Sequence, residues 1–419
     1  MKILHVTQGY TPAIGGTEFL FQKISETLVQ DYGDDVTVFT TNCFNGEAFW
    51  NPRLPRMATG WSQINEVKVL RFPVRSRVSQ ALRPAQKIFN TLNLPYNDWL
   101  RTFFGGPIIP GLRNAIEKFP AEVVAASSFP LLHMFDTLAA GKASRKSVVF
   151  HGGIHPKDNW GFNRNNIYQA IQQCDCYLAN TDYEVQFLKQ KGIRHEHVRV
   201  VGCGVSPEEF SGITTQEARK FLGLPQNIPI IGFIGQIGTH KGIDTLVKAM
   251  PVVWENFSDA HLVIAGGRAM FAEHLDRILE TWPETHRQKL HLHYNFSEAE
   301  KPYLFNAIDI FAYPSGYESF GIAYLEAWAS KKPVIGTWSG AIPWVVSPGQ
   351  DGLLVNFQDF EQLSQAILIL LKYPDWAKSM GESGYKKTVR QYTWHQVAKR
   401  FREGYEFGIQ KHMIAQTIH

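Results

Sequence analysis

Residues 312–355, AYPSGYESFGIAYLEAWASKKPVIGTWSGAIPWVVSPGQDGLLV, decide the fold. A strand-like run, IDIFAYP, leads into a turn that contains glycine, SGYESFG, and an apolar run with helical character, IAYLEAWAS, follows. A short second strand, PVIGT, and a loop rich in Gly and Pro complete the stretch. Unpaired N–H groups point outward at a helix N-terminus. The stretch therefore predicts a strand–turn–helix unit that attracts an anion.

Two carboxylates in this stretch, Glu318 and Glu326, lie eight residues apart. Glu318 falls in the turn, and Glu326 lies about two helical turns along, roughly 12 Å away at 1.5 Å per residue. A half-buried carboxylate needs partners. We expect Glu326 to accept hydrogen bonds from ribose hydroxyls and Glu318 to accept one from a sugar hydroxyl.

Length and composition bound the class of protein. The 419 residues exceed what one hydrophobic core usually supports, which predicts two domains. A net charge of +4 is too small to indicate nucleic acid as a partner. The four cysteines show no zinc spacing, the first ten residues do not resemble a signal peptide, and no apolar run is long enough to span a membrane. We expect a cytoplasmic protein, with peripheral membrane contact left open.

Apolar runs that predict buried strands alternate with helix-like segments in both halves of the chain. In the first half they are Ile3–Thr7, Asp35–Thr41, Val67–Phe72, Ala121–Ser127, Ser147–His151, Cys176–Asn180 and Val198–Cys203. In the second half they are Ile230–Ile234, His261–Ala265, Leu290–Tyr294 and Ile308–Tyr313. This order predicts an α/β protein with two Rossmann-like, doubly wound parallel-sheet domains that face each other across a cleft.

The expected domain limits follow from a polar connecting segment. We place the first domain at residues 1–206, a linker at 207–228 and the second domain at 229–395. A last helix, 396–419, is expected to pack back on the first domain.

A glycine-rich loop follows the first strand. Gly15 and Gly16 let the backbone approach a ligand closely, although a bare tight turn would explain them too. Their spacing is not that of a dinucleotide-binding loop. Thr17 is the expected N-cap of a helix over Phe19–Leu28.

A second glycine-rich loop, GQIGTHKG, opens the second domain. An ammonium at Lys241 can pair with a diphosphate, while the alternative is a surface lysine. Together with the helix N-terminus at Ser319–Gly321, Lys241 can hold a pyrophosphate without a metal. The chain has no Asp-x-Asp pair to present a divalent cation.

Two further features in the first domain are candidates. His151 ends a predicted strand and precedes two glycines, which is where open α/β sheets bind ligands. Arg71, Arg75 and Arg77 belong to a basic region that is either a solvated helical face or an acceptor surface for a phosphorylated sugar or an anionic lipid headgroup.

These motifs resemble the family 4 retaining glycosyltransferases of the GT-B fold. The likeness covers essentially the whole chain and rests on GGTE near the start, HGG after a central strand, the lysine–glycine pair after the second glycine loop, and PSxxESFGxxxLEA with its E-x7-E signature.

The resemblance implies an acceptor-binding first domain and a donor-binding second domain. Glu318 would act near the reacting centre and Glu326 on the ribose, and the backbone of Ser319, Phe320 and Gly321 would hold the diphosphate with Lys241. His151 would contact the sugar or the leaving group. Gly15 and Gly16 would line the diphosphate and the acceptor. The leaving phosphate would help to deprotonate the acceptor on the same face of the sugar.

Two positions depart from the family pattern. The family usually has an arginine where this chain has Gln236, so half of the positive charge expected on the diphosphate is missing, and Arg268 is the candidate substitute. The family's GGxPE run has Ala341 and Trp344 in place of a glycine and the glutamate.

We therefore expect a metal-independent retaining hexosyltransferase without a cofactor, whose donor is a nucleotide sugar, UDP-sugar being favoured over GDP- or ADP-sugar. The acceptor is a sugar, a sugar phosphate or a lipid-linked sugar. The alternatives are transfer to a sugar phosphate as in sucrose-phosphate synthase, a catalytically weak nucleotide-sugar-binding partner, and, disfavoured by the E-x7-E signature, a sugar epimerase.

Overall fold

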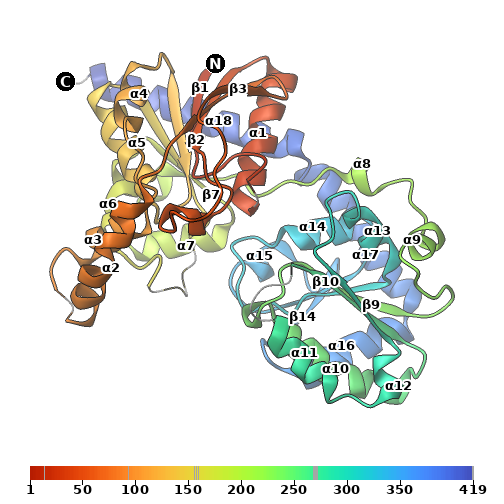
Figure 1. The fold of residues 1–419 in the computed structure, drawn as a ribbon. Coiled ribbons are helices and arrows are strands. Elements are labelled where there is room, and N and C mark those ends of the chain that lie inside the picture. Colours follow the sequence, from red (N-terminus) through yellow and green to blue (C-terminus); the bar gives the residue numbers. More distant parts are fainter. Residues whose placement is uncertain are drawn as a thin grey trace. The chain divides into compact units, whose positions relative to one another are not determined.

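The chain forms two compact units. The computed structural model describes residues 1–417 except 14, 93, 155, 157, 159 and 268–271. Unit 1 contains Met1–Gly202 and Trp394–His419, and unit 2 contains Cys203–Thr393 (Figure 1). Each unit has its own sheet and its own hydrophobic core.

The sheet of unit 1 has eight strands among the described residues, in the order β3-β4-β2-β1-β5-β6-β7-β8. Neighbouring strands are parallel except β3 and β4. The strands are β1 (Lys2–Val6), β2 (Asp35–Thr41), β3 (Gly60–Ile64), β4 (Val67–Phe72), β5 (Val123–Ser127), β6 (Ser147–His151), β7 (Cys176–Ala179) and β8 (Val198–Val200). Strand order reverses between β1 and β5, where doubly wound sheets open a ligand crevice.

Helices cover both faces of this sheet. They are α1 (Gly16–Tyr32), η1 (Gly46–Phe49), α2 (Ser76–Thr91), α3 (Asn97–Gly105), α4 (Leu112–Lys118), α5 (Leu132–Ala143), α6 (Asn165–Gln173), α7 (Asp182–Gln190), η2 (His195–His197) and α18 (Trp394–Thr417). Alternate residues of β1 feed two cores: Ile3 packs with α1 and α18, and Leu4 packs with α4 to α7 on the other face.

The last helix, α18, packs closely on the sheet of unit 1. A Cβ on Gly404 would lie 2.4 Å from Leu178 Cδ2, and one on Gly408 would lie 2.8 Å from Val149 Cγ2. Buried His5 of β1 also contacts the Tyr405 hydroxyl at 3.0 Å. The helix is therefore an integral part of unit 1.

The sheet of unit 2 has six parallel strands among the described residues, in the order β11-β10-β9-β12-β13-β14. They are β9 (Ile230–Ile234), β10 (His261–Gly266), β11 (Leu290–Tyr294), β12 (Ile310–Ala312), β13 (Val334–Thr337) and β14 (Gly352–Val355). Its helices are α8 (Pro207–Phe210), α9 (Thr215–Phe221), η3 (Thr239–Lys241), α10 (Ile243–Asn256), α11 (Ala272–Glu280), α12 (Glu284–Arg287), α13 (Lys301–Ala307), α14 (Ile322–Ala329), α15 (Ile342–Val345), α16 (Phe360–Lys372) and α17 (Pro374–Gln391).

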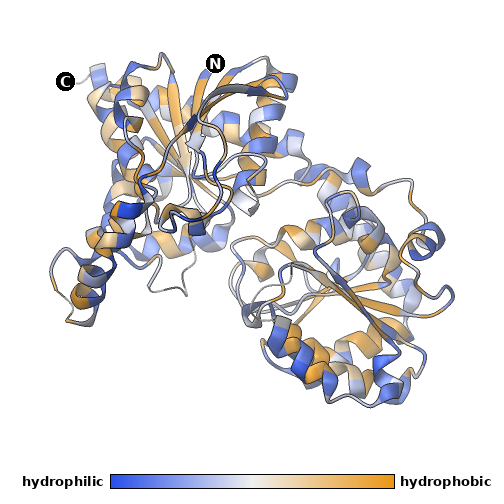
Figure 2. Ribbon diagram, in the orientation of Figure 1, coloured by the Kyte–Doolittle hydropathy of each residue, from blue (hydrophilic) through white to orange (hydrophobic). Residues whose placement is uncertain are grey.

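The buried strands explain why the fold class was predictable. β9 is buried at every residue, and so are β5 and β6. Figure 2 shows the strands of both sheets as mostly hydrophobic. Strands covered on both faces appear in the sequence as continuous apolar runs, and the doubly wound parallel-sheet class is confirmed for both units.

Two sequence expectations need correction, and two strands were missed. The predicted linker, 207–228, belongs to unit 2, because Phe210 and Ala218 are buried in its core. Thr17 does not cap α1, whose N-cap is Gly15. β3 was not predicted because its side chains are mostly exposed, and β14 was not predicted because it directly follows a loop rich in Gly and Pro.

None of the helices in the described residues is long and apolar enough to cross a bilayer.

Candidate active site

In unit 2, two loops meet at the carboxyl ends of β9 and β12. These strands are neighbours, with Ile231 paired to Ile310 and Gly232 to Phe311. Strand order reverses between them, and each loop leads into the N-terminus of a helix, α10 or α14. This is the place where a doubly wound sheet binds anionic ligands.

A glycine lets the two loops touch. Gly242 has φ +72°, and a Cβ there would lie 2.1 Å from the carbonyl oxygen of Pro314. The Gly316 N–H donates to the His240 carbonyl at 2.9 Å, and the Ser315 hydroxyl contacts the same oxygen at 3.2 Å. These contacts fix the β9–α10 loop against the β12–α14 loop.

The contact brings Lys241 and Glu318 together. Lys241 Nζ lies 2.7 Å from Glu318 Oε1, and the two side chains are 14% and 12% exposed. The Lys241 ammonium also lies 5.8 Å from the ring centroid of buried Tyr313. Two of the predicted residues therefore form a half-buried ion pair at the sheet edge, where a ligand diphosphate would compete with Glu318 for the ammonium.

The third loop, after β13, supports the Glu318 turn from behind. The Ala341 N–H donates to the Glu318 carbonyl at 3.3 Å, and a Cβ on Gly340, with φ +59°, would lie 3.1 Å from that oxygen. Thr337 Oγ1 donates to the carbonyl of Ser315. Ala341, one of the departures from the family pattern, is thus fully buried, whereas Trp344 is exposed.

Glu326 has a cationic partner in this structure. Its Oε1 accepts from Lys301 Nζ on α13 at 3.0 Å. Burial raises the pKa of Glu326, and Lys301 opposes that shift. Glu318 and Glu326 both raise the pKa of Tyr313, after its burial, so the two carboxylates act on one buried phenol. Tyr313 was not singled out in the sequence, although its place directly after β12 was a usable signal.

The other predicted donor-site residues have different settings. Gly321, with φ +96°, is the N-cap of α14, and Phe320 is buried against Tyr392. Ser319 precedes them in the same turn, and Gln236 is exposed in the β9–α10 loop. Arg268 lies outside the described residues.

In unit 1, His151 is occupied by protein contacts. It is 3% exposed at the end of β6, with Nδ1 2.8 Å from Ser127 Oγ and Nε2 2.9 Å from Asn180 Oδ1. Phe401 stacks on the ring. Burial lowers the pKa of His151 to about 4. Both nitrogens have protein partners in this structure, which gives His151 a structural role, and its catalytic role stays a prediction.

Glu184 of α7 holds the loop that follows His151, and sequence reasoning missed it. Its buried carboxylate accepts from the N–H groups of Gly153 and Ile154, both at 3.1 Å, and from the Tyr177 hydroxyl at 2.6 Å. A fourth hydrogen bond comes from the Asn180 N–H at 2.9 Å. The signal was an acidic residue in the first turn of a helix that directly follows a strand.

Gly15 and Gly16 lie at the start of α1 in unit 1. A Cβ on Gly15 would lie 2.2 Å from Glu18 Oε2, while nothing lies within 4 Å of one on Gly16. Gln8 Nε2 donates to Glu18 Oε1 at 2.9 Å, and burial raises the pKa of Glu18. Gly16 is thus the open position of this loop.

The three predicted acceptor arginines do not form one surface. Arg71 is buried, and its guanidinium donates to the Thr11 carbonyl at 2.7 Å and to Ser62 Oγ at 2.8 Å. Arg75 and Arg77 are exposed at the start of α2. Arg71 therefore stabilises the β1–α1 loop instead of binding an acceptor.

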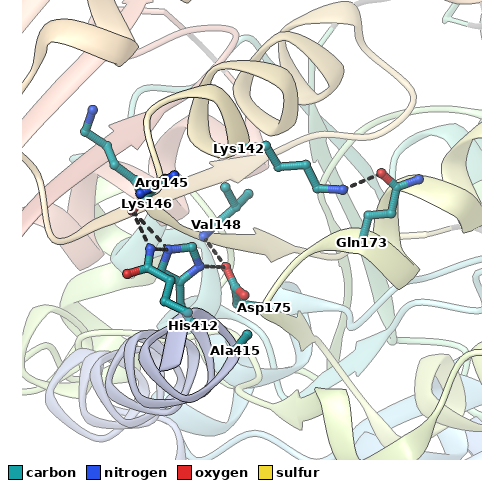
Figure 3. Close-up of a pocket in the computed structure, with 9 residues that line it drawn as sticks. Lys142, Arg145, Lys146, Val148, Gln173, Asp175, His412 and Ala415 are labelled. Carbon is teal, nitrogen blue, oxygen red and sulfur yellow. Dashed lines mark hydrogen bonds and ion pairs between the residues drawn. The ribbon is translucent and has the colours of Figure 1, made fainter. Parts of the chain in front are cut away.

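A cavity of about 510 Å³ in unit 1 lies at the other end of the sheet (Figure 3). Its lining includes Val148 at the start of β6 and cations from the ends of helices. Lys146 Nζ donates to the carbonyl of Glu117 at 2.6 Å, and His412 Nε2 contacts the carbonyl of Arg145 at 3.0 Å. Cations at helix C-termini satisfy free carbonyls, so the positive charge here serves the fold.

Two doubly wound parallel-sheet domains are the architecture of the GT-B class. Family models agree: "Glycosyltransferase Family 4" matches residues 14–209, and "Glycosyl transferases group 1" matches residues 214–387. The chain belongs to the family 4, group 1, glycosyltransferases, and the resemblance is confirmed.

Individual relatives agree with the family. The chain is 31% identical over 247 residues to a D-inositol 3-phosphate glycosyltransferase of Corynebacterium urealyticum, covering 57% of this chain and 58% of that protein. The chain thus spans less than two thirds of that relative. It is 23% identical over 416 residues, 95% of this chain and 96% of the other, to the uncharacterized glycosyltransferase MJ1607 of Methanocaldococcus jannaschii.

Solved structures share the fold. Sucrose-phosphate synthase from Thermosynechococcus elongatus has a TM-score of 0.70 at 19% identity, covering 97% of this chain and 98% of that one. Anabaena HepE in complex with UDP-glucose has a TM-score of 0.71 at 17% identity, covering 96% and 98%.

Proposed function

We propose that the protein transfers a sugar from a nucleoside-diphosphate donor to a hydroxyl acceptor, with retention of configuration and without a metal. The observation that carries this is the Lys241–Glu318 pair at 2.7 Å between two helix N-termini. An ammonium beside outward N–H groups is suited to the charge that develops on a departing diphosphate. Lys241 would bind that diphosphate, and the backbone of Ser319, Phe320 and Gly321 would assist.

In the ligand-free protein, the Lys241 ammonium stabilises the charge of Glu318, which makes this carboxylate a weak nucleophile. Retention is proposed from the family resemblance. Glu318 would position Lys241 and accept a hydrogen bond from a hydroxyl of the donor sugar. The leaving phosphate would take the proton from the attacking hydroxyl of the acceptor. Glu326 would exchange its contact with Lys301 for ribose hydroxyls.

UDP is the proposed donor nucleotide, supported by the structural likeness to HepE, whose structure holds UDP-glucose. The acceptor is a sugar, a sugar phosphate or a lipid-linked sugar, and peripheral membrane contact accompanies the last of these. The name of the Corynebacterium relative favours a phosphorylated acceptor. Transfer to a sugar phosphate, as in sucrose-phosphate synthase, is the second candidate, supported by the shared fold.

Thermal unfolding with UDP, GDP and ADP tests donor binding. A nucleotide at 100 times its Kd should stabilise the protein by about 2.7 kcal/mol. Hydrolysis of the donor by the wild type but not by Glu318→Gln would distinguish an enzyme from a catalytically weak binding partner. No shift with any of the three nucleotides would contradict the proposal.

A further inference from the structure

The hairpin of α2 and α3 in unit 1, residues 75–105, exposes an unusual number of hydrophobic side chains. Figure 1 shows these helices extending away from the sheet of unit 1. Six of the 21 exposed large hydrophobic side chains in the described residues lie between residues 78 and 103: Val78, Ile88, Leu92, Tyr96, Trp99 and Phe103. Such clustering marks an interaction surface.

The geometry of the hairpin gathers these side chains into stripes. Ile88 and Leu92 are four residues apart, so they lie on one face of the end of α2. Trp99 and Phe103 repeat the spacing on α3, with ring centroids 6.5 Å apart. Tyr96, 80% exposed, lies between the two helices in the chain. Aromatic residues beside aliphatic ones are typical of helices that lie in a membrane interface.

The hairpin is strongly basic. Residues 75–105 contain five Lys and Arg residues and one acidic residue, Asp98, which pairs with Arg101. Arg75, Arg77, Arg83 and Lys87 are exposed, and none of the four makes an ion pair with the described residues. Their positive charge is therefore available to an anionic binding partner.

We propose that the α2–α3 hairpin docks unit 1 on an anionic lipid bilayer. Unpaired cations beside exposed Ile, Leu, Tyr and Trp match the anionic headgroups and the acyl boundary of such a surface. The inference gives a surface and a lipid charge to the membrane contact raised above. It does not depend on sugar transfer.

Vesicle flotation of the full chain tests the proposal. The wild type should float with vesicles of phosphatidylcholine mixed with phosphatidylglycerol, and much less with phosphatidylcholine alone. Arg83→Gln with Lys87→Gln should weaken binding roughly 25-fold, since each cation near the surface contributes about fivefold. Ile88→Ser with Leu92→Ser should weaken it roughly 10- to 30-fold through lost apolar burial.

Matched controls lie on other parts of unit 1. Met413→Ser with Ile414→Ser changes side chains that are each 62% exposed, as Leu92 is. Lys118→Gln with Lys399→Gln removes two exposed cations. Both controls should bind vesicles as the wild type does.

Two results would overturn the proposal. One is a wild type that does not bind anionic vesicles, or controls that weaken binding as much as the hairpin variants. The other is a dimer that Ile88→Ser with Leu92→Ser dissociates, which would assign the surface to a second copy of the chain. UDP-induced stabilisation is measured on the same samples, so a failure of membrane docking remains distinguishable from a failure of the donor site.

Discussion

Strand order reverses near the middle of both sheets, yet their carboxyl edges use polar groups in opposite ways. At the edge of unit 1, His151 and Glu184 make hydrogen bonds to neighbouring strands and loops. At the edge of unit 2, Lys241 and Glu318 neutralise each other and remain partly exposed. The topology of a sheet places the ligand site at its carboxyl edge. Whether a polar side chain there can bind the ligand depends on the hydrogen bonds and ion pairs that it already makes.

The largest expected effect is a loss of enzymatic activity when the carboxyl edge of unit 2 is altered. Lys241→Met should lower kcat/KM by roughly 100- to 1,000-fold, about 3–4 kcal/mol, because it removes the charge that faces the leaving diphosphate. Lys248→Met, on the exposed side of α10, should leave kcat/KM unchanged. Steady-state kinetics with the donor identified by thermal shift measures both. Equal rates for the wild type and Lys241→Met would remove Lys241 from the site.

The second prediction concerns the contribution of Glu184, at the carboxyl edge of unit 1, to the free energy of unfolding. Glu184→Ala should lower the free energy of unfolding by about 3 kcal/mol, because it leaves buried N–H groups of the 153–154 loop without an acceptor. Glu196→Ala, an exposed carboxylate in the same unit, should cost less than about 0.5 kcal/mol. Urea denaturation measures the difference, and similar costs for the two changes would show that Glu184 is not the anchor of that loop.

A glycine pair tests how tightly the loops of unit 2 are joined. Gly242→Ala should cost roughly 2–3 kcal/mol, since its Cβ would meet the Pro314 carbonyl at 2.1 Å in addition to the strain of a positive φ. Gly223→Ala has nearly the same φ, +66°, with nothing within 4 Å, and should cost about 1 kcal/mol. Thermal unfolding compares them. Costs that match would mean that the two loops separate easily.

The last prediction concerns the pH dependence of stability at the edge of unit 1. Buried His151 has a pKa of about 4 in the folded protein and 6.5 as its ordinary value, so the unfolded chain binds its proton first on acidification. Its contribution to stability is present above about pH 6.5 and is lost as the pH falls toward 4, at about 1.4 kcal/mol per pH unit. His151→Gln should reduce the slope of unfolding free energy against pH by one proton in this window. An unchanged slope would mean that folding does not lower the pKa of the His151 ring.

The sequence predicted the strands of both sheets well, because covered parallel strands are continuous apolar runs. β2, β4, β6, β9 and β11 match their predicted ranges. β3 escaped because an antiparallel edge strand such as GWSQI exposes most of its side chains. The 207–228 segment looked like a linker because its polar residues hide the few, such as Phe210, that reach the core of unit 2.

The positions of the candidate residues in unit 2 were predictable, because the E-x7-E and lysine–glycine motifs each lie within one loop and the helix that follows it. The contact between Lys241 and Glu318, which are 77 residues apart, could not be predicted from spacing. The fate of His151 depends on Ser127 and Asn180, which neighbouring strands bring to it from 24 and 29 residues away. Arg71 likewise meets Thr11 across 60 residues. Spacing holds no information about such partners.

Calorimetric titration of UDP into three proteins, the wild type, Lys241→Met and His151→Gln, tests most directly that the ligand-binding edge belongs to unit 2. The account predicts binding by the wild type, roughly 10- to 100-fold weaker binding by Lys241→Met because a charge-assisted contact is lost, and unchanged affinity for His151→Gln. Unchanged affinity for Lys241→Met, or an equal loss with His151→Gln, would contradict it.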